Sequence, residues 1–209
     1  MFALSTTIHL YASKRNDKPL RDKSKPFILL GLIGLYYFSV DKISITVVLA
    51  LIFSWIGDLF LIKKGVKWFA IGGISFLVSH IFFILSYIPN VNFNNIDITL
   101  AIILGIIYFS IVTFLFTKLK KHLPKALFYP MYLYLLINGT MNCFAIFRYL
   151  SIFDTAGLIT LIGAVLFFIS DCTLFFVRFD KNTIFKTHFL VMFTYSIGEL
   201  LITLGLILG

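Results

Sequence analysis

Long apolar runs separated by short basic segments are the feature that most limits what this chain can fold into. Seven runs cover residues 26–40, 43–62, 68–88, 98–116, 126–149, 156–177 and 185–208, and a shorter one covers residues 1–12. In lipid the backbone must satisfy its own hydrogen bonds, which a helix of about 20 residues does while crossing the bilayer. The sequence therefore predicts an all-α fold: a polytopic membrane helical bundle of about eight transmembrane helices.

The same pattern sets the domain organisation. With 60% hydrophobic and only 13% charged residues, the chain leaves no room for a sizeable soluble domain. We expect a single integral membrane domain over residues 1–209. Its first run would be about 18 Å long as a helix, so it either crosses briefly or rests in the interface.

The basic residues lie between alternate apolar runs. All of the 18 lysines and arginines except Lys42 and Arg148 fall in segments 14–25, 63–67, 118–125 and 178–186. This is the positive-inside pattern, so the net charge of +9 indicates topology and contact with anionic membrane lipids, not nucleic acid. It predicts cytoplasmic basic loops and an outside C-terminus, in a bacterial inner membrane or the endoplasmic reticulum.

Two aspartates lie within apolar runs. A charged side chain in a bilayer costs about 2.5–3.5 kcal/mol on insertion scales, so Asp58 and Asp171 are candidate functional residues. Asp58 precedes Lys63 by five residues and Asp171 precedes Arg178 by seven, which places both acids at similar depth in the cytoplasmic half. We expect them to meet if their helices pack together. Two four-span halves, each with an acid in its third span, also suggest a 4+4 internal repeat.

Other polar side chains lie deeper in the predicted spans or repeat along one helix face. They are His80, Tyr134, Asn138, Asn142, Tyr195 and Glu199. Hydrogen bonding between helices and contact with a substrate are both open for these residues. For Glu199 a cavity-facing position is favoured, because burying a carboxyl group is costly. The remaining histidines (His9, His122 and His188) are expected at the surface.

Several catalytic motifs are absent from the sequence. It has no HExxH or CxxC zinc motif, no Gly-rich phosphate loop and no G-x-S-x-G elbow, so we expect neither a metal nor a cofactor. Two carboxylates at low dielectric titrate in separate steps and can serve as general acid and general base. This chemistry suits hydrolysis of a lipid bond near the cytoplasmic interface; a structural or proton-conducting pair is the alternative.

The residues around the two acids resemble the signatures of the YhhN-like lysoplasmalogenases. The first signature is Ser54-Trp-Ile-Gly-Asp58, followed by Gly72, Gly73, Phe76, Ser79 and His80; the second runs from Gly163 to Asp171; Lys25-Pro26 and Thr194-Tyr195 match shorter elements. The resemblance covers nearly the whole chain in order and spacing. It departs from the family pattern at Phe83, where many members have Tyr, and at Glu199, where Gln is expected.

The resemblance implies an eight-span ether hydrolase that cleaves the vinyl ether of lysoplasmalogens. The products would be a fatty aldehyde and glycerophosphoethanolamine or glycerophosphocholine. Asp171 is expected to donate a proton and Asp58 to act as the base. The expected substrate-binding residues are His80, Tyr195, Glu199, Asn138 and Lys25; the last of these, with Lys63 and Arg178, could bind the head-group phosphate or simply anchor the loops.

Three other functions compete with this interpretation. A proton-coupled membrane transporter could use the same buried acids, with His80 and Glu199 as relays, and is the main alternative. An intramembrane aspartyl protease would need Gly at position 55, where this chain has Trp55. A zinc-dependent lipid amidase would need a histidine cluster that the sequence lacks.

Overall fold

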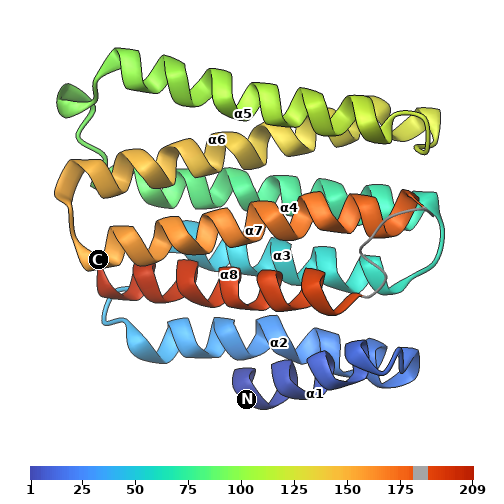
Figure 1. The fold of residues 1–209 in the computed structure, drawn as a ribbon. Coiled ribbons are helices and arrows are strands. Elements are labelled where there is room, and N and C mark those ends of the chain that lie inside the picture. The colour runs from blue at the N-terminus through green and yellow to red at the C-terminus, as the bar shows by residue number, and fades with distance from the viewer. Residues whose placement is uncertain (181–187) are drawn as a thin grey trace.

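A computed structural model describes residues 1–180 and 188–209, and all regular structure in these residues is helical (Figure 1). The helices of more than three residues are α1 (Phe2–Lys14), α2 (Lys18–Ser39), α3 (Ile45–Ile62), α4 (Val66–Tyr87), α5 (Ile98–Leu119), α6 (Phe128–Ile152), α7 (Thr155–Phe179) and α8 (His188–Leu208). Short 3-10 helices, η1 (Ile88–Asn90), η2 (Phe93–Asn95) and η3 (Lys125–Leu127), lie in two of the connections.

The helices form one bundle with their long axes roughly aligned (Figure 1). The most extensive contacts join α7 to α8 and α3 to α4, while α6 packs against both α4 and α7. Helix α5 lies at one edge on α6, and the α1–α2 pair lies at the other edge, where both helices contact α8. The arrangement brings residues from α1, α2, α3, α4, α7 and α8 to one region.

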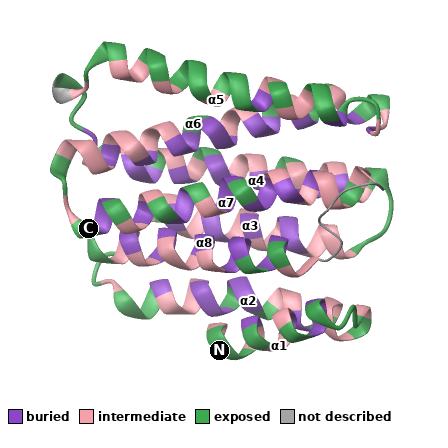
Figure 2. Ribbon diagram, in the orientation of Figure 1, coloured by how far each residue is buried: buried purple, intermediate pink, exposed green. Residues whose placement is uncertain are grey.

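Burial follows this arrangement (Figure 2). The buried residues concentrate on α3, α4, α6, α7 and α8, whereas α5 buries only Val112 and Leu119. Large apolar side chains on the outer face of α5, including Ile106 and Phe114, are exposed. Such a face is stable only against lipid, because apolar surface is costly in water.

Six helices, α3 to α8, are long and apolar enough to span a membrane. Helix α1 has 13 residues and α2 carries charged residues through its first two turns, so neither meets both conditions over the described residues. The chain is thus a multi-pass membrane protein. The count of eight spans and the internal repeat remain predictions.

Helix α2 begins earlier than the apolar pattern indicated. The sequence predicted a start at Pro26, but the Asp17 side chain caps the helix by accepting a 3.1 Å hydrogen bond from the Leu20 backbone N–H, and Pro26 lies inside. Pro19 occupies the first turn, where a missing N–H costs nothing. Hydropathy could not reveal these first turns, because their side chains are mostly charged.

The described connections between helices differ at the two ends of the bundle. Residues 15–17, 63–65 and 120–124, which carry basic side chains, connect helices at the right-hand end of Figure 1. The connections at residues 40–44 and 153–154 lie at the opposite end. The predicted basic residues Lys181 and Lys186, and the predicted start of the last span at 185, fall outside the described residues.

Candidate active site

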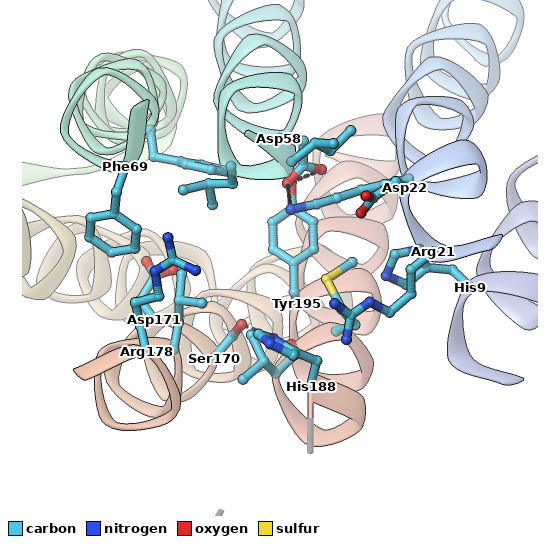
Figure 3. Close-up of a pocket in the computed structure, with 17 residues that line it drawn as sticks. His9, Arg21, Asp22, Asp58, Phe69, Ser170, Asp171, Arg178, His188 and Tyr195 are labelled. Carbon is cyan, nitrogen blue, oxygen red and sulfur yellow. Dashed lines mark hydrogen bonds and ion pairs between the residues drawn. The ribbon is translucent and has the colours of Figure 1, made fainter. Parts of the chain in front are cut away.

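A cavity of about 90 Å³ lies among the helices near the end of the bundle that carries the basic connections (Figure 3). Asp58 of α3 and Asp171 of α7 both line it, so the two acids share one cavity. The packing of their helices that the prediction assumed is not found, because α3 and α7 are not among the closely packed helix pairs. The cavity is also lined by basic, aromatic and histidine side chains: Arg21, Lys25, Arg178, Phe69, Phe76, Tyr195, His9 and His188.

Asp58 lies on the buried face of α3 and is held by a charged partner. Lys25 Nζ of α2 is 3.0 Å from Asp58 Oδ1, and the Tyr195 hydroxyl of α8 donates a 3.0 Å hydrogen bond to Oδ2. The side chains of Asp58 and Lys25 are 2% and 13% exposed. Both carboxylate oxygens therefore have partners, and one of these partners is a cation.

Asp171 is held by neutral donors instead. The Tyr134 hydroxyl and the Asn138 amide donate hydrogen bonds of 2.5 and 2.7 Å to the same oxygen, Oδ2. His80 Nε2 lies 3.7 Å from this oxygen, and the His80 side chain is fully buried. Asn142 Nδ2 in turn donates to Asn138 Oδ1 at 3.2 Å, which fixes the Asn138 amide with its NH2 group toward Asp171.

The polar face predicted on residues 134, 138 and 142 thus supports one carboxyl group. Asn138 and His80 do not line the cavity: Asn138 donates a hydrogen bond to Asp171, and His80 lies next to Asp171 without a hydrogen bond to the described residues. The periodicity of this face was visible in the sequence, but the helix that it contacts was not. The contact is made by the packing of α6 against α7, which only the structure shows.

Glu199 lies deeper in the bundle. A cavity-facing position was predicted for it, but its side chain is fully buried among the helices and does not line the aspartate cavity. Its polar neighbour is Ser54, whose hydroxyl shares a 2.8 Å hydrogen bond with Ser79. Neither Glu199 carboxyl oxygen has a hydrogen bond of standard geometry to the residues that the structure describes.

Basic side chains surround the mouth of the cavity. Arg21, Lys25 and Arg178 line it, and Figure 3 shows Arg178 on the Asp171 side and Arg21 on the opposite side. Lys63, which was also a candidate for phosphate binding, lies instead over the ring of Trp68 at 4.0 Å and does not line the cavity.

Two histidines also line the cavity, and no pattern in the sequence indicated either of them. His9 was expected at the surface, but it is buried and its Nδ1 lies 3.0 Å from Ser24 Oγ. Burial first, and then the charges of Lys25 and Arg21, lower the pKa of His9 to about 3. His9 is therefore neutral near pH 7. His188, at the start of α8, lines the same cavity.

The described residues contain no group of three or more His, Cys, Asp or Glu side chains that could hold a metal ion. What the site offers is a carboxylate paired with an ammonium group, a second carboxyl group held by neutral donors, and a cationic mouth. This arrangement can provide a base, an acid and an anion-binding surface.

Comparison with known proteins agrees with the sequence signatures. Neither curated proteins nor solved structures give a match to this chain. The profile of the YhhN family matches residues 20–206, which include both aspartates, helices α3 to α7 and all but the outermost residues of α2 and α8. This multi-pass membrane protein therefore belongs to the YhhN family.

Proposed function

We propose that the protein is a lysoplasmalogenase-like hydrolase that cleaves the vinyl ether bond of a lysoplasmalogen. The observation that carries this proposal is the pairing of Asp58 and Asp171 on one cavity in different environments. Asp58 has a cationic partner at 3.0 Å, whereas the described hydrogen-bond donors to Asp171 are neutral. Family membership and the sequence signatures support the same reaction class.

The chemistry assigns one role to each carboxyl group. Both donors to Asp171 converge on Oδ2, which leaves Oδ1 to carry a proton. That proton passes to the β-carbon of the enol ether and leaves an oxocarbenium ion at the carbon bonded to oxygen. Asp58 takes a proton from the water that attacks this carbon, and the hemiacetal then collapses to an aldehyde and the glycerol hydroxyl.

The cationic mouth suits the rest of the substrate. Arg21, Lys25 and Arg178 offer donors for a phosphodiester, and arginine binds phosphate oxygens through two parallel hydrogen bonds. The basic connections lie at the same end of the bundle as this mouth, and the positive-inside rule therefore supports a head-group site at the cytoplasmic face.

The test uses purified protein in detergent with lysoplasmenyl-ethanolamine, and it measures aldehyde release. Wild type is expected to release aldehyde from the vinyl ether and none from the saturated alkyl ether. Asp58→Asn and Asp171→Asn should each lower turnover by about 10²–10⁴-fold, the usual contribution of a general acid or base. Asp41→Asn, which changes an exposed aspartate away from the cavity, is the matched control. Near-normal turnover in both cavity variants would exclude the mechanism.

A proton-coupled transporter is the second candidate. It is favoured by His80 and Glu199, two buried ionisable side chains that do not line the cavity. Neither side chain takes part in the proposed hydrolysis. A transporter would move a substrate across vesicles without forming an aldehyde. Flux assays in proteoliposomes therefore separate the two functions.

A further inference from the structure

An apolar groove lies beside the candidate active site, between α4 and α6. It has a volume of about 560 Å³, and its walls come from these two helices, Leu127 of η3 and Phe175 of α7. Ile74, Tyr129 and Leu133 at its wall are 58%, 88% and 52% exposed. The groove therefore opens on the outer surface of two membrane-spanning helices, where lipid chains are the surrounding solvent.

A smaller void of about 20 Å³ lies between the groove and the aspartate cavity and shares wall residues with both. The void shares Gly73, Tyr134 and Phe175 with the groove, and it shares Leu61, Phe76 and Leu174 with the cavity. Phe69 lines all three spaces. The three spaces therefore lie in a row from the lipid-facing surface to the two carboxyl groups, separated by the side chains that they share, Phe69 among them.

Tyr134 places the inner end of the groove next to the chemistry. Its side chain lines both the groove and the void, and its hydroxyl donates the 2.5 Å hydrogen bond to Asp171 Oδ2. An aliphatic chain that enters from the groove would therefore reach the proposed proton donor along the Tyr134 ring.

The sizes and the polarity of the spaces assign different parts of a lipid to them. Ligand pockets usually measure roughly 300–1,000 Å³. The aspartate cavity, at about 90 Å³ with charged walls, suits the polar end of a lipid but cannot hold a long chain. The groove, at about 560 Å³ with almost wholly apolar walls, falls within the usual range and suits hydrocarbon.

We propose that the groove between α4 and α6 binds the hydrocarbon chain of a single-chain lipid whose reacting bond lies at Asp58 and Asp171. The assignment of the reacting bond rests on the proposed function. The void is too narrow for a chain as it stands, so the Phe69 side chain has to turn aside. Its ring packs edge-on against Phe175 and Phe179, at centroid distances of 5.7 and 5.1 Å, and a rotamer change of this kind is common on ligand binding.

Gly73 offers a way to close the passage without disturbing the fold. It lines the groove and the void, and a Cβ atom added there would have no heavy atom within 4 Å. Gly34 on α2 is equally half-buried and equally open to a Cβ atom, but it lines none of the three spaces. Gly73→Leu and Gly34→Leu are therefore a matched pair.

The first measurement compares long-chain and short-chain lysoplasmenyl-ethanolamines with wild type and both glycine variants. Gly73→Leu should lower kcat/KM by about tenfold or more for the long chain and by less than about twofold for the short chain, because the leucine fills space that only the long chain needs. Gly34→Leu should follow wild type. A Gly73→Leu variant with the wild-type chain-length profile would overturn the proposal.

The second measurement does not depend on catalysis. Lysophosphatidylethanolamine with a photoreactive diazirine at the chain end is crosslinked to the protein, and the labelled peptides are mapped. Labelling of α4 and α6 that Gly73→Leu reduces, and Gly34→Leu does not, supports the groove as a chain site. Labelling outside the groove would overturn the proposal. So would groove labelling that a double-chain phospholipid matches and that Gly73→Leu does not reduce, because the groove would then hold only bulk membrane lipid.

The two measurements separate this inference from the proposed function. Groove labelling without aldehyde release would reject the reaction and keep the chain site. Aldehyde release with neither groove labelling nor a change in chain preference would keep the reaction and reject the chain site.

Discussion

The backbones of α7 and α8 are in direct contact at Gly163 and Gly198. A Cβ atom on Gly163 would lie 2.7 Å from the Gly198 carbonyl oxygen, and one on Gly198 would lie 2.9 Å from the Gly163 carbonyl oxygen. Small residues that allow such close approach are a common basis of helix association in membranes. This contact fixes the most extensive helix pair, which carries Asp171 on one helix and Tyr195 on the other.

Gly163→Ala should therefore destabilise the protein. The added methyl group has to push α7 away from α8, and overpacking of this kind costs about 1–3 kcal/mol. Thermal unfolding in detergent should show a lower midpoint for this variant. Gly105→Ala on α5, where a Cβ atom meets nothing within 4 Å, is the control; its midpoint should equal or slightly exceed that of wild type, because alanine favours a helix more than glycine does. Equal midpoints for the two variants would contradict the packing account.

The ion pair between Lys25 and Asp58 predicts that the stability effects of substituting these two residues are coupled. Lys25→Met leaves a buried carboxylate without its cationic partner, which costs about 3–5 kcal/mol when a buried pair is broken. Adding Asp58→Asn removes the charge that was left alone, so the double variant should unfold at a higher temperature than Lys25→Met. A double variant no more stable than the single one would mean that the pair contributes no coupling energy.

Glu199→Gln should raise the free energy of unfolding. The buried carboxyl group lacks a standard hydrogen bond to the described residues, and an unsatisfied buried polar group costs about 1–3 kcal/mol, or more when it is charged. An amide carries no charge to desolvate. Denaturation of both proteins in the same detergent measures the difference. A lower stability of the glutamine variant would contradict this prediction and show that the carboxyl group makes a favourable interaction. In a flux assay, loss of substrate transport by the same variant would favour a proton relay.

The position of His9 predicts a pH effect on stability. The pKa of His9 is lowered from 6.5 to about 3 in the folded protein, so unfolding allows the imidazole to bind a proton below pH 6.5. Its contribution to stability is fully present above pH 6.5 and is lost as the pH falls toward 3, by up to about 1.4 kcal/mol per pH unit. His9→Gln should unfold with a shallower dependence on pH over this window. An unchanged slope would contradict the burial of a neutral His9.

The sequence predicted the helices well where apolar residues alone define them. Helices α3, α4, α5 and α7 begin and end close to the predicted residues, because apolar runs bounded by charged residues have few other ways to satisfy their backbone. It failed at α2, where Asp17 and Pro19 start a helix whose first turns are charged. Those turns carry Lys25 to Asp58, so the error in the helix start also hid an ion pair.

The site was predictable in part. Intramembrane aspartates are costly enough to stand out, and the spacing of Tyr134 and Asn138 showed a polar face. The partner of that face, the burial of His9 and the size of the cavity depend on contacts between helices far apart in sequence. Periodicity within one helix carries no information about such contacts.

Helix α5 differs from its neighbours in what its sequence has to preserve. Because it buries only Val112 and Leu119 and packs mainly on α6, most of its side chains have lipid as their only neighbour. Lipid accepts any apolar shape, so relatives in the family should retain the hydropathy of α5 while its residues drift. On α7, with eleven buried residues, the size of each inward side chain should be kept instead. An alignment of the family would then show faster residue substitution on α5 than on α7, although the two helices are of similar length.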